Sequence, residues 1–133
     1  MFTIAQIQHA HSKVRSGADF PKYIQDIKKL GVESFITFVA DSNTEYFGKD
    51  GFKAMSGAKY STLEIAPTAD IDSLKHCLQI HQKGETDYFT FCREAAAAGV
   101  VKWIVSMDEM TCIYYDNKDS EMLAEIIPRP NSL

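Results

Sequence analysis

The fold of this chain is decided by residues 19–48, which read DFPKYIQDIKKLGVESFITFVADSNTEYFG. Asp19 is a residue type that favours the N-cap of a helix, and Gly31 is typical of the position where a helix ends. The stretch between them carries apolar residues at helical spacing, which predicts one helix. Residues 33–40 are apolar on both faces, which predicts an interior strand covered on both sides. A turn then leads into a short strand at 44–47.

Residues 87–116, DYFTFCREAAAAGVVKWIVSMDEMTCIYYD, follow the same plan 68 positions later. Roughly two identities would arise by chance between segments of this length and ordinary composition. Five identities occur: Asp19/Asp87, Gly31/Gly99, Val32/Val100, Ile36/Ile104 and Tyr46/Tyr114. The matches fall on caps, helix stops and expected core-facing aromatics. We therefore predict a helix–helix–strands unit that occurs twice, with pseudo-repeat halves at about 1–66 and 67–128. The alternative is that two unrelated halves look alike because caps and helix stops look alike.

Further elements flank these two segments. Thr3 and Gln6 form a capping-box pattern before a first helix, which matches a later helix, capped by Asp70, at a shift of 70 positions. Additional strands are expected at 52–55, 61–65 and 121–127. The fold class is therefore α+β, with a mostly antiparallel sheet packed against helices. We expect a single domain over 1–133, with a loose tail at 129–133.

The bulk composition excludes several classes of protein. The chain has 133 residues, of which 45% are apolar and 24% are charged, as in a globular protein with a core of its own. The net charge is −4, and no dense group of basic residues occurs, so nucleic acid is not expected as a partner. No apolar run is long enough to cross a membrane, and no signal peptide is recognised at the start. Three cysteines are an odd, sparse set that fits reduced thiols, so we expect a cytoplasmic location.

Two groups of residues are candidates for chemistry. Cys77 and His81 are four positions apart on an expected helix, a spacing that suits two zinc ligands. However, the repeat places them on an apolar stripe, so we expect core packing there and no bound metal. Tyr46 and Tyr114 lie on short strands near acidic turn residues such as Asp108, and these three are the candidate ligand-binding residues. Their alternative role is ordinary strand and turn structure.

The sequence contains no recognised catalytic or cofactor motif. Neither a nucleophile elbow nor a zinc-protease, dinucleotide or phosphate-loop pattern occurs. We therefore expect no cofactor and no catalytic residue, and the chain is more readily interpreted as a binding protein than as an enzyme. Eight phenylalanines, six tyrosines and one tryptophan favour self-association or a protein partner, with 44–47 and 121–127 as edge strands that could pair. The alternative is a small enzyme or small-molecule binder with a Tyr- and Asp-lined pocket between helices and sheet.

Several stretches also carry a family resemblance. Residues 97–103, AAGVVKW, together with Asp108, the pair at 114–115 and the stretch SGADF at 16–20, resemble the YbcV/YdfO-like family of small bacterial proteins. Some members lie in prophages and carry the label "phage envelope protein". The resemblance covers nearly the whole chain and implies an α+β fold. It implies no catalytic residue that would carry over to this sequence.

Overall fold

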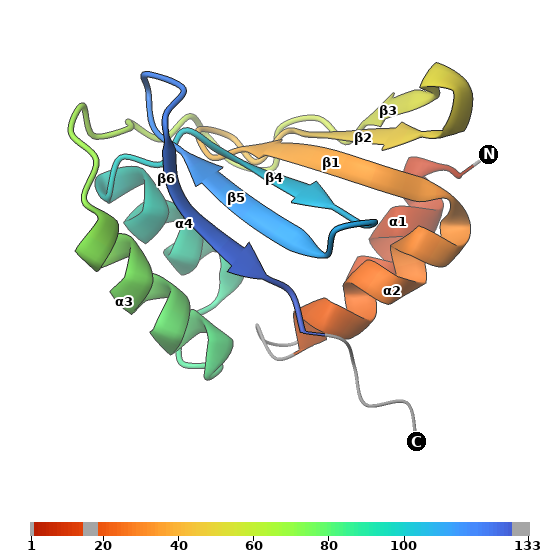
Figure 1. Ribbon diagram of the computed structural model, residues 1–133, viewed down its shortest axis with the longest axis horizontal. Coiled ribbons are helices and arrows are strands. Elements are labelled where there is room, and N and C mark those ends of the chain that lie inside the picture. The colour runs from red at the N-terminus through yellow and green to blue at the C-terminus, as the bar shows by residue number, and fades with distance from the viewer. Residues whose placement is uncertain (1, 15–18, 129–133) are drawn as a thin grey trace.

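The computed structural model describes residues 2–14 and 19–128 (Figure 1). Within them the chain forms four α-helices, one short 3₁₀ helix and six strands. In chain order these are α1 (Ile4–His11), α2 (Phe20–Leu30), β1 (Val32–Phe38), β2 (Thr44–Gly48), η2 (Lys49–Gly51), β3 (Lys53–Met55), α3 (Ile71–Gln82), α4 (Tyr88–Ala97), β4 (Lys102–Ser106), β5 (Thr111–Tyr115) and β6 (Glu121–Ile126). In the described part of the chain, no helix has the length and apolar character needed to cross a membrane.

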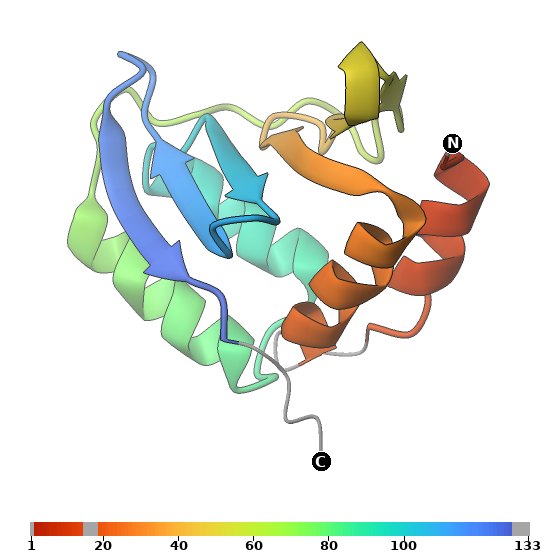
Figure 2. The same ribbon diagram turned by 45° about the vertical axis from the view of Figure 1, so that its right-hand side comes forward.

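The six strands form one sheet in the order β3-β2-β1-β4-β5-β6, and every neighbouring pair is antiparallel. All four helices lie against the same face, α1 and α2 toward one end of the sheet and α3 and α4 toward the other (Figures 1 and 2). The strands β1 and β4 meet at the centre, where Ile36 lies opposite Ile104. The predicted α+β class with an antiparallel sheet packed against helices is confirmed.

Short-range capping explains where the helices begin. The Thr3 hydroxyl accepts a hydrogen bond from the Gln6 backbone N–H at 3.1 Å, and the Gln6 side chain accepts one from the Thr3 N–H at 2.9 Å. Asp70 caps α3 by accepting from the Ser73 N–H at 3.1 Å, and Asp87 caps α4 in the same way. These contacts satisfy backbone donors that a helix start leaves free, as the patterns at Thr3, Asp70 and Asp87 predicted. Asp19 stands at the N-cap of α2, but its side chain makes no capping hydrogen bond.

The core fills the space between the sheet and the helices. Strand residues alternate, so that on β1 Phe35 and Thr37 are buried while Ile36 and Phe38 are half-buried on the opposite face. The most completely buried side chains include Ile24, Ile27, Leu74, Val39, Cys92 and Val105, each 0% exposed. They come from both halves of the chain and belong to one hydrophobic core within the described residues.

Three strand predictions are wrong. The segment 33–40 was expected to be covered on both faces, but all helices pack on one face of β1. Residues 61–65 form no strand, because the chain there runs as a loop from β3 to α3. Residues 44–47 lie in β2, which pairs with β1 and β3, so they are not an edge strand. The edges are β3 and β6.

The two halves have the same order of elements, two helices followed by three strands. Backbone conformations also correspond: Gly31 and Gly99 both have positive φ, as do Ser42 and Met110, two non-glycine residues 68 positions apart. These correspondences support the duplicated unit. The duplication and the division into halves stay predictions until the two halves are superposed. The expected tail, 129–133, lies outside the described residues.

Candidate functional site

A cavity of about 230 Å³ lies between α1, β2, the first residue of α4 and the loop that follows β3. Its lining mixes apolar side chains with hydroxyls, an imidazole and one ammonium group. The lining residues are Ile4, Ile7, Gln8, His11, Ser12, Tyr46, Ser56, Lys59 and Tyr88. Sites for small molecules usually combine an apolar wall with a few polar groups in this way.

Helix α1 supplies one wall through its inward face. Ile4, Ile7 and His11 are spaced three or four positions apart, so they lie on the same side of the helix. His11 makes edge-on contacts with the rings of Tyr23, at 5.2 Å between centroids, and Tyr88, at 6.1 Å. Aromatic packing therefore holds the imidazole at the cavity, and burial lowers its pKa, with a smaller contribution from the charge of Lys59.

Two tyrosines supply hydroxyl groups. Tyr46 faces the helices from β2, beside Phe35, with a ring separation of 5.5 Å. Burial raises the pKa of Tyr46, against smaller opposing effects of side-chain hydrogen bonds from Tyr23 and Thr44. The hydroxyl therefore keeps its proton and can still donate it to a ligand. The Tyr88 hydroxyl lies 2.7 Å from the hydroxyl of Ser42, a fully buried residue with φ of 62°. That contact orients the Tyr88 ring at the cavity.

Lys59 is the cation at the cavity. Its backbone N–H donates to the Asp41 carbonyl oxygen at 2.7 Å, which anchors the loop beside the Asp41–Asn43 turn. Its ammonium nitrogen lies 5.9 Å from the centroid of the Tyr88 ring. Lys59 is exposed in the loop, yet desolvation by the groups around its ammonium lowers its pKa. Since none of the described residues that line the cavity is acidic, the site favours polar or anionic ligands over cations.

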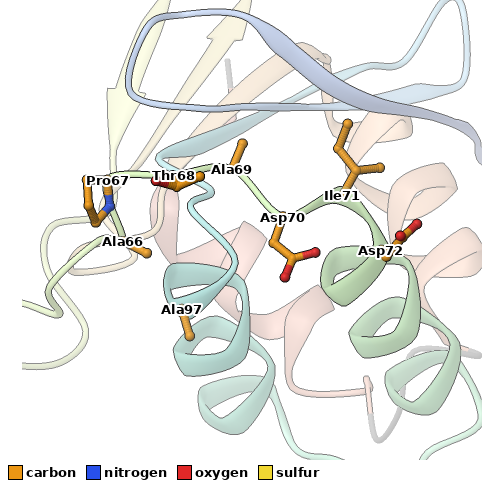
Figure 3. A pocket seen from close by; sticks show the side chains of 8 residues that line it. All are labelled: Ala66, Pro67, Thr68, Ala69, Asp70, Ile71, Asp72 and Ala97. Atoms are coloured by element: carbon orange, nitrogen blue, oxygen red, sulfur yellow. The ribbon is translucent and has the colours of Figure 1, made fainter.

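A second hollow, of about 710 Å³, is wide and open and lies where α4 ends and α3 begins (Figure 3). Small side chains line most of it, including Ala66, Pro67 and Ala97. Two acidic residues, Asp70 and Asp72, also line it. Asp70 accepts hydrogen bonds from the backbone and the hydroxyl of Ser73, at 3.1 and 2.8 Å, so its carboxylate is occupied in capping α3. Asp72 is exposed, and the wide opening of this hollow makes it the weaker candidate.

Comparison with known proteins now places the chain in a family. The family model described as "Protein of unknown function (DUF1398)" matches residues 8–126. The chain belongs to the DUF1398 family. This DUF1398 protein is also similar to "Uncharacterized protein YcgX" of Escherichia coli (strain K12), with 20% identity over 115 residues that cover 86% of each chain. The expected kinship with a family of small bacterial proteins is confirmed at this level.

The predicted ligand-binding residues of this DUF1398 protein occupy different places. Tyr46 lines the cavity. Tyr114 is buried on β5, where its hydroxyl donates to Glu125 Oε1 at 3.2 Å, and Asp108 is exposed in the turn after β4. Neither of these two is among the residues that line the cavity. A ligand role for all three therefore stays a prediction.

The candidate metal ligands of the DUF1398 protein are engaged in packing. Cys77 is buried, and the ring of His81 stacks on Phe91 at 4.7 Å while its Nδ1 lies 3.1 Å from the Thr86 carbonyl oxygen. Across the described residues, no three His, Cys, Asp or Glu side chains come together in an arrangement that could hold a metal ion. The two residues therefore lack the further ligands that a zinc site needs.

Sequence reasoning did not single out His11, Lys59 or Tyr88 of this DUF1398 protein as site residues. His11 was assigned to an apolar helical stripe, and it does pack against aromatic rings. Lys59 lies in a loop with no recognisable pattern, and Tyr88 matches Phe20 in the repeat and so looked like a core residue. They meet only through the tertiary fold, because they come from three segments far apart in the chain.

Proposed function

We propose that this protein is a non-catalytic binding protein and that its site for a small organic molecule is the cavity between α1, β2, α4 and Lys59. The observation that carries the proposal is the combination of an apolar wall, hydroxyl donors and one cation around a single hollow. A volume of about 230 Å³ is below the usual range for drug-sized ligands, ~300–1,000 Å³. At ~30 Å³ per water molecule the cavity has the capacity of about eight waters, which fits a small metabolite and is too small for a dinucleotide.

Binding is favoured over catalysis by the way in which the polar groups are used. The Tyr88 hydroxyl is engaged with the Ser42 hydroxyl at 2.7 Å, and both phenol groups at the cavity have raised pKa values because of burial. General acid–base catalysis works best when the pKa of the group lies near the working pH. These phenols are therefore suited to donating hydrogen bonds and poorly suited to transferring protons.

A fragment screen by ¹⁵N–¹H NMR tests this proposal. Compounds of up to about ten non-hydrogen atoms should shift the amide signals of Tyr46, Lys59 and Tyr88. Ser12 lies at the rim of the cavity, so Ser12→Phe should weaken those compounds at least tenfold. The matched control is Ser61→Phe, an exposed loop position that does not line the cavity. Compounds that bind both variants equally, or a screen that shifts none of the three signals, would contradict the proposal.

A second candidate function is self-association through the uncovered face of the sheet. Apolar side chains from four central strands lie half-buried on the face away from the helices: Ile36, Phe38, Phe47, Ile104 and Ile113. The face also carries two ion pairs, Lys53 with Glu45 at 3.2 Å and Lys102 with Asp119 at 2.7 Å, so it presents both positive and negative charges. A patch with both charges can complement a second copy of itself across a two-fold axis.

Sedimentation velocity up to millimolar concentration tests the self-association. A dimer of the parent protein should be weakened by Ile104→Lys, because the new charge would be buried at the centre of the interface. Lys75→Met, on the exposed side of α3, serves as the control. A parent protein that stays monomeric throughout that range would remove this candidate.

The remaining expectations about context join this proposal. We place the protein in the cytoplasm and expect no nucleic-acid partner. The three cysteines are free and buried, which fits a reducing compartment, and the net charge of −4 opposes binding to phosphate backbones. Membership of the YbcV/YdfO-like group, and any link to prophages, likewise remain predictions from the resemblance.

A further inference from the structure

We infer that the ligand of the cavity carries a carboxylate, held by the Tyr46 hydroxyl and the Lys59 ammonium group with its apolar part against Ile4 and Ile7. This inference rests on the proposed small-molecule site and adds the chemical class of its ligand. It comes from a comparison of the cavity with the corresponding place in the other half of the molecule.

In the second half that place is filled by a carboxylate of the chain itself. Glu125 on β6 accepts a hydrogen bond from the Tyr114 hydroxyl at 3.2 Å. Its other oxygen accepts one from the side-chain amide of Gln82, the last residue of α3, at 3.3 Å. A strand tyrosine and the end of a helix thus hold one carboxylate between them.

The first half has smaller residues at two of these places, and its tyrosine hydroxyl has Tyr23 and Thr44 as additional hydrogen-bond partners. Tyr46 is the counterpart of Tyr114 at the shift of 68 positions, and Ser12 is the counterpart of Gln82 at the shift of 70. The pairing of neighbouring strands identifies the first-half counterpart of Glu125. Ser56 lies beside Thr44, with its N–H donating to the Thr44 carbonyl oxygen at 3.0 Å.

Glu125 lies beside Cys112 in the same way, and Cys112 is 68 positions after Thr44. The first half therefore has two serines where the second half has a glutamine and a glutamate. The volume that the longer side chains fill in the second half is hollow in the first half. Both Ser12 and Ser56 line the cavity there. A ligand carboxylate in this hollow would replace the missing glutamate group.

Charge points to the same ligand class. Lys59 lies at the cavity, and none of the described lining residues carries a carboxylate to neutralise it. A charge-assisted hydrogen bond from an ammonium group to a carboxylate is roughly twice as strong as a neutral one. The desolvation that lowers the pKa of Lys59 would be offset by a bound anion. A neutral or cationic ligand would bring no such gain.

NMR titration with benzoate and butanoate tests the inference, with benzamide, butanamide and benzylamine as matched neutral and cationic probes. Each carboxylate should shift the signals of Tyr46 and Lys59 and bind at least tenfold more tightly than its amide. Lys59→Met should weaken carboxylate binding at least tenfold, whereas Lys75→Met should leave it unchanged. Ser56→Glu should abolish binding, because the new side chain supplies an internal carboxylate as Glu125 does.

The outcomes separate this inference from the proposed function. Amides or benzylamine that bind at the same signals as tightly as the carboxylates would overturn the carboxylate class and leave a small-molecule site standing. Carboxylates that shift no cavity signal at 20 mM would also overturn it. If the broader fragment screen were negative as well, the small-molecule function would fall with it. Should Ser56→Glu not fold, Lys59→Met against Lys75→Met still decides the role of the charge.

Discussion

Replacing Gly99 by alanine should destabilise this protein more than the same replacement at Gly31. Both glycines stand at the end of a helix with positive φ, +90° at Gly99 and +110° at Gly31. A Cβ at Gly31 would meet nothing closer than the Phe2 side chain at 3.8 Å. A Cβ at Gly99 would lie 2.7 Å from the carbonyl oxygen of Thr68, a backbone atom.

The expected magnitudes follow from these contacts. A left-handed conformation costs a non-glycine residue about 1–2 kcal/mol, which is the whole cost expected for Gly31→Ala. At Gly99 the neighbouring loop must also move. That loop is held by hydrogen bonds from the Ala66 N–H to Ala96, at 2.9 Å, and from the Asp70 N–H to Ala98, at 2.8 Å. Losing one such bond costs about 0.5–1.5 kcal/mol, so Gly99→Ala should cost about 1.5–3.5 kcal/mol.

Urea unfolding followed by the fluorescence of Trp103 measures both variants. With a slope of about 1–3 kcal/mol/M, a loss of 3 kcal/mol lowers the midpoint by about 1–3 M. Unchanged slopes would show that the two variants unfold from the same compact state. Equal losses at the two glycines would refute the clash with the loop, and a Gly99→Ala protein as stable as the parent would also refute the left-handed strain.

Three further predictions concern the stability of the fold, its dependence on pH and the reactivity of the thiols. Tyr88→Phe removes the 2.7 Å contact with the fully buried Ser42 hydroxyl and should lower the free energy of unfolding by about 1–3 kcal/mol in urea titrations. An unchanged midpoint would contradict that hydrogen bond. Burial lowers the pKa of His11 and of His81 in the folded state, so the unfolded chain binds protons first as the pH falls below about 6.5. The free energy of unfolding should therefore fall from pH 7 to pH 5. Its dependence on pH should be flatter for the double variant His11→Asn/His81→Asn. Parallel pH profiles for the parent and the variant would disprove the contribution of these two histidines. The native protein should show no rapid reaction with Ellman's reagent, since burial raises the pKa of all three thiols, whereas the unfolded chain should react at each of them: Cys77, Cys92 and Cys112.

Local signals account for the part of the fold that could be predicted. The capping pattern at Thr3, the cap at Asp87 and the stop at Gly31 each involve residues within one turn of helix, so the sequence contains the whole interaction. Strand pairing is not local. Residues 61–65 have the composition of a strand but no neighbouring strand to pair with, and they run as a loop.

The same distinction explains the site. Tyr46 was a candidate because a tyrosine on a strand can be recognised from its neighbours alone. Its position beside His11, Lys59 and Tyr88 depends on how α1, a loop and α4 meet in space. Lys59 in particular has no sequence signal, since an exposed lysine in a loop is common. Ser12 and Ser56 also line the cavity, and small residues become informative only when the corresponding larger ones are known.

The order of strands has a consequence for how the chain reaches its native state. Pairings within β1-β2-β3 and within β4-β5-β6 join neighbours in sequence, so each three-stranded meander can form quickly. The central pairing of β1 with β4 joins Ile36 to Ile104, which are 68 positions apart, and it must wait until a long intervening segment is brought round. We therefore expect the rate-limiting barrier of folding to be the meeting of two preformed meanders, with substitutions along this junction slowing refolding more than substitutions in either hairpin.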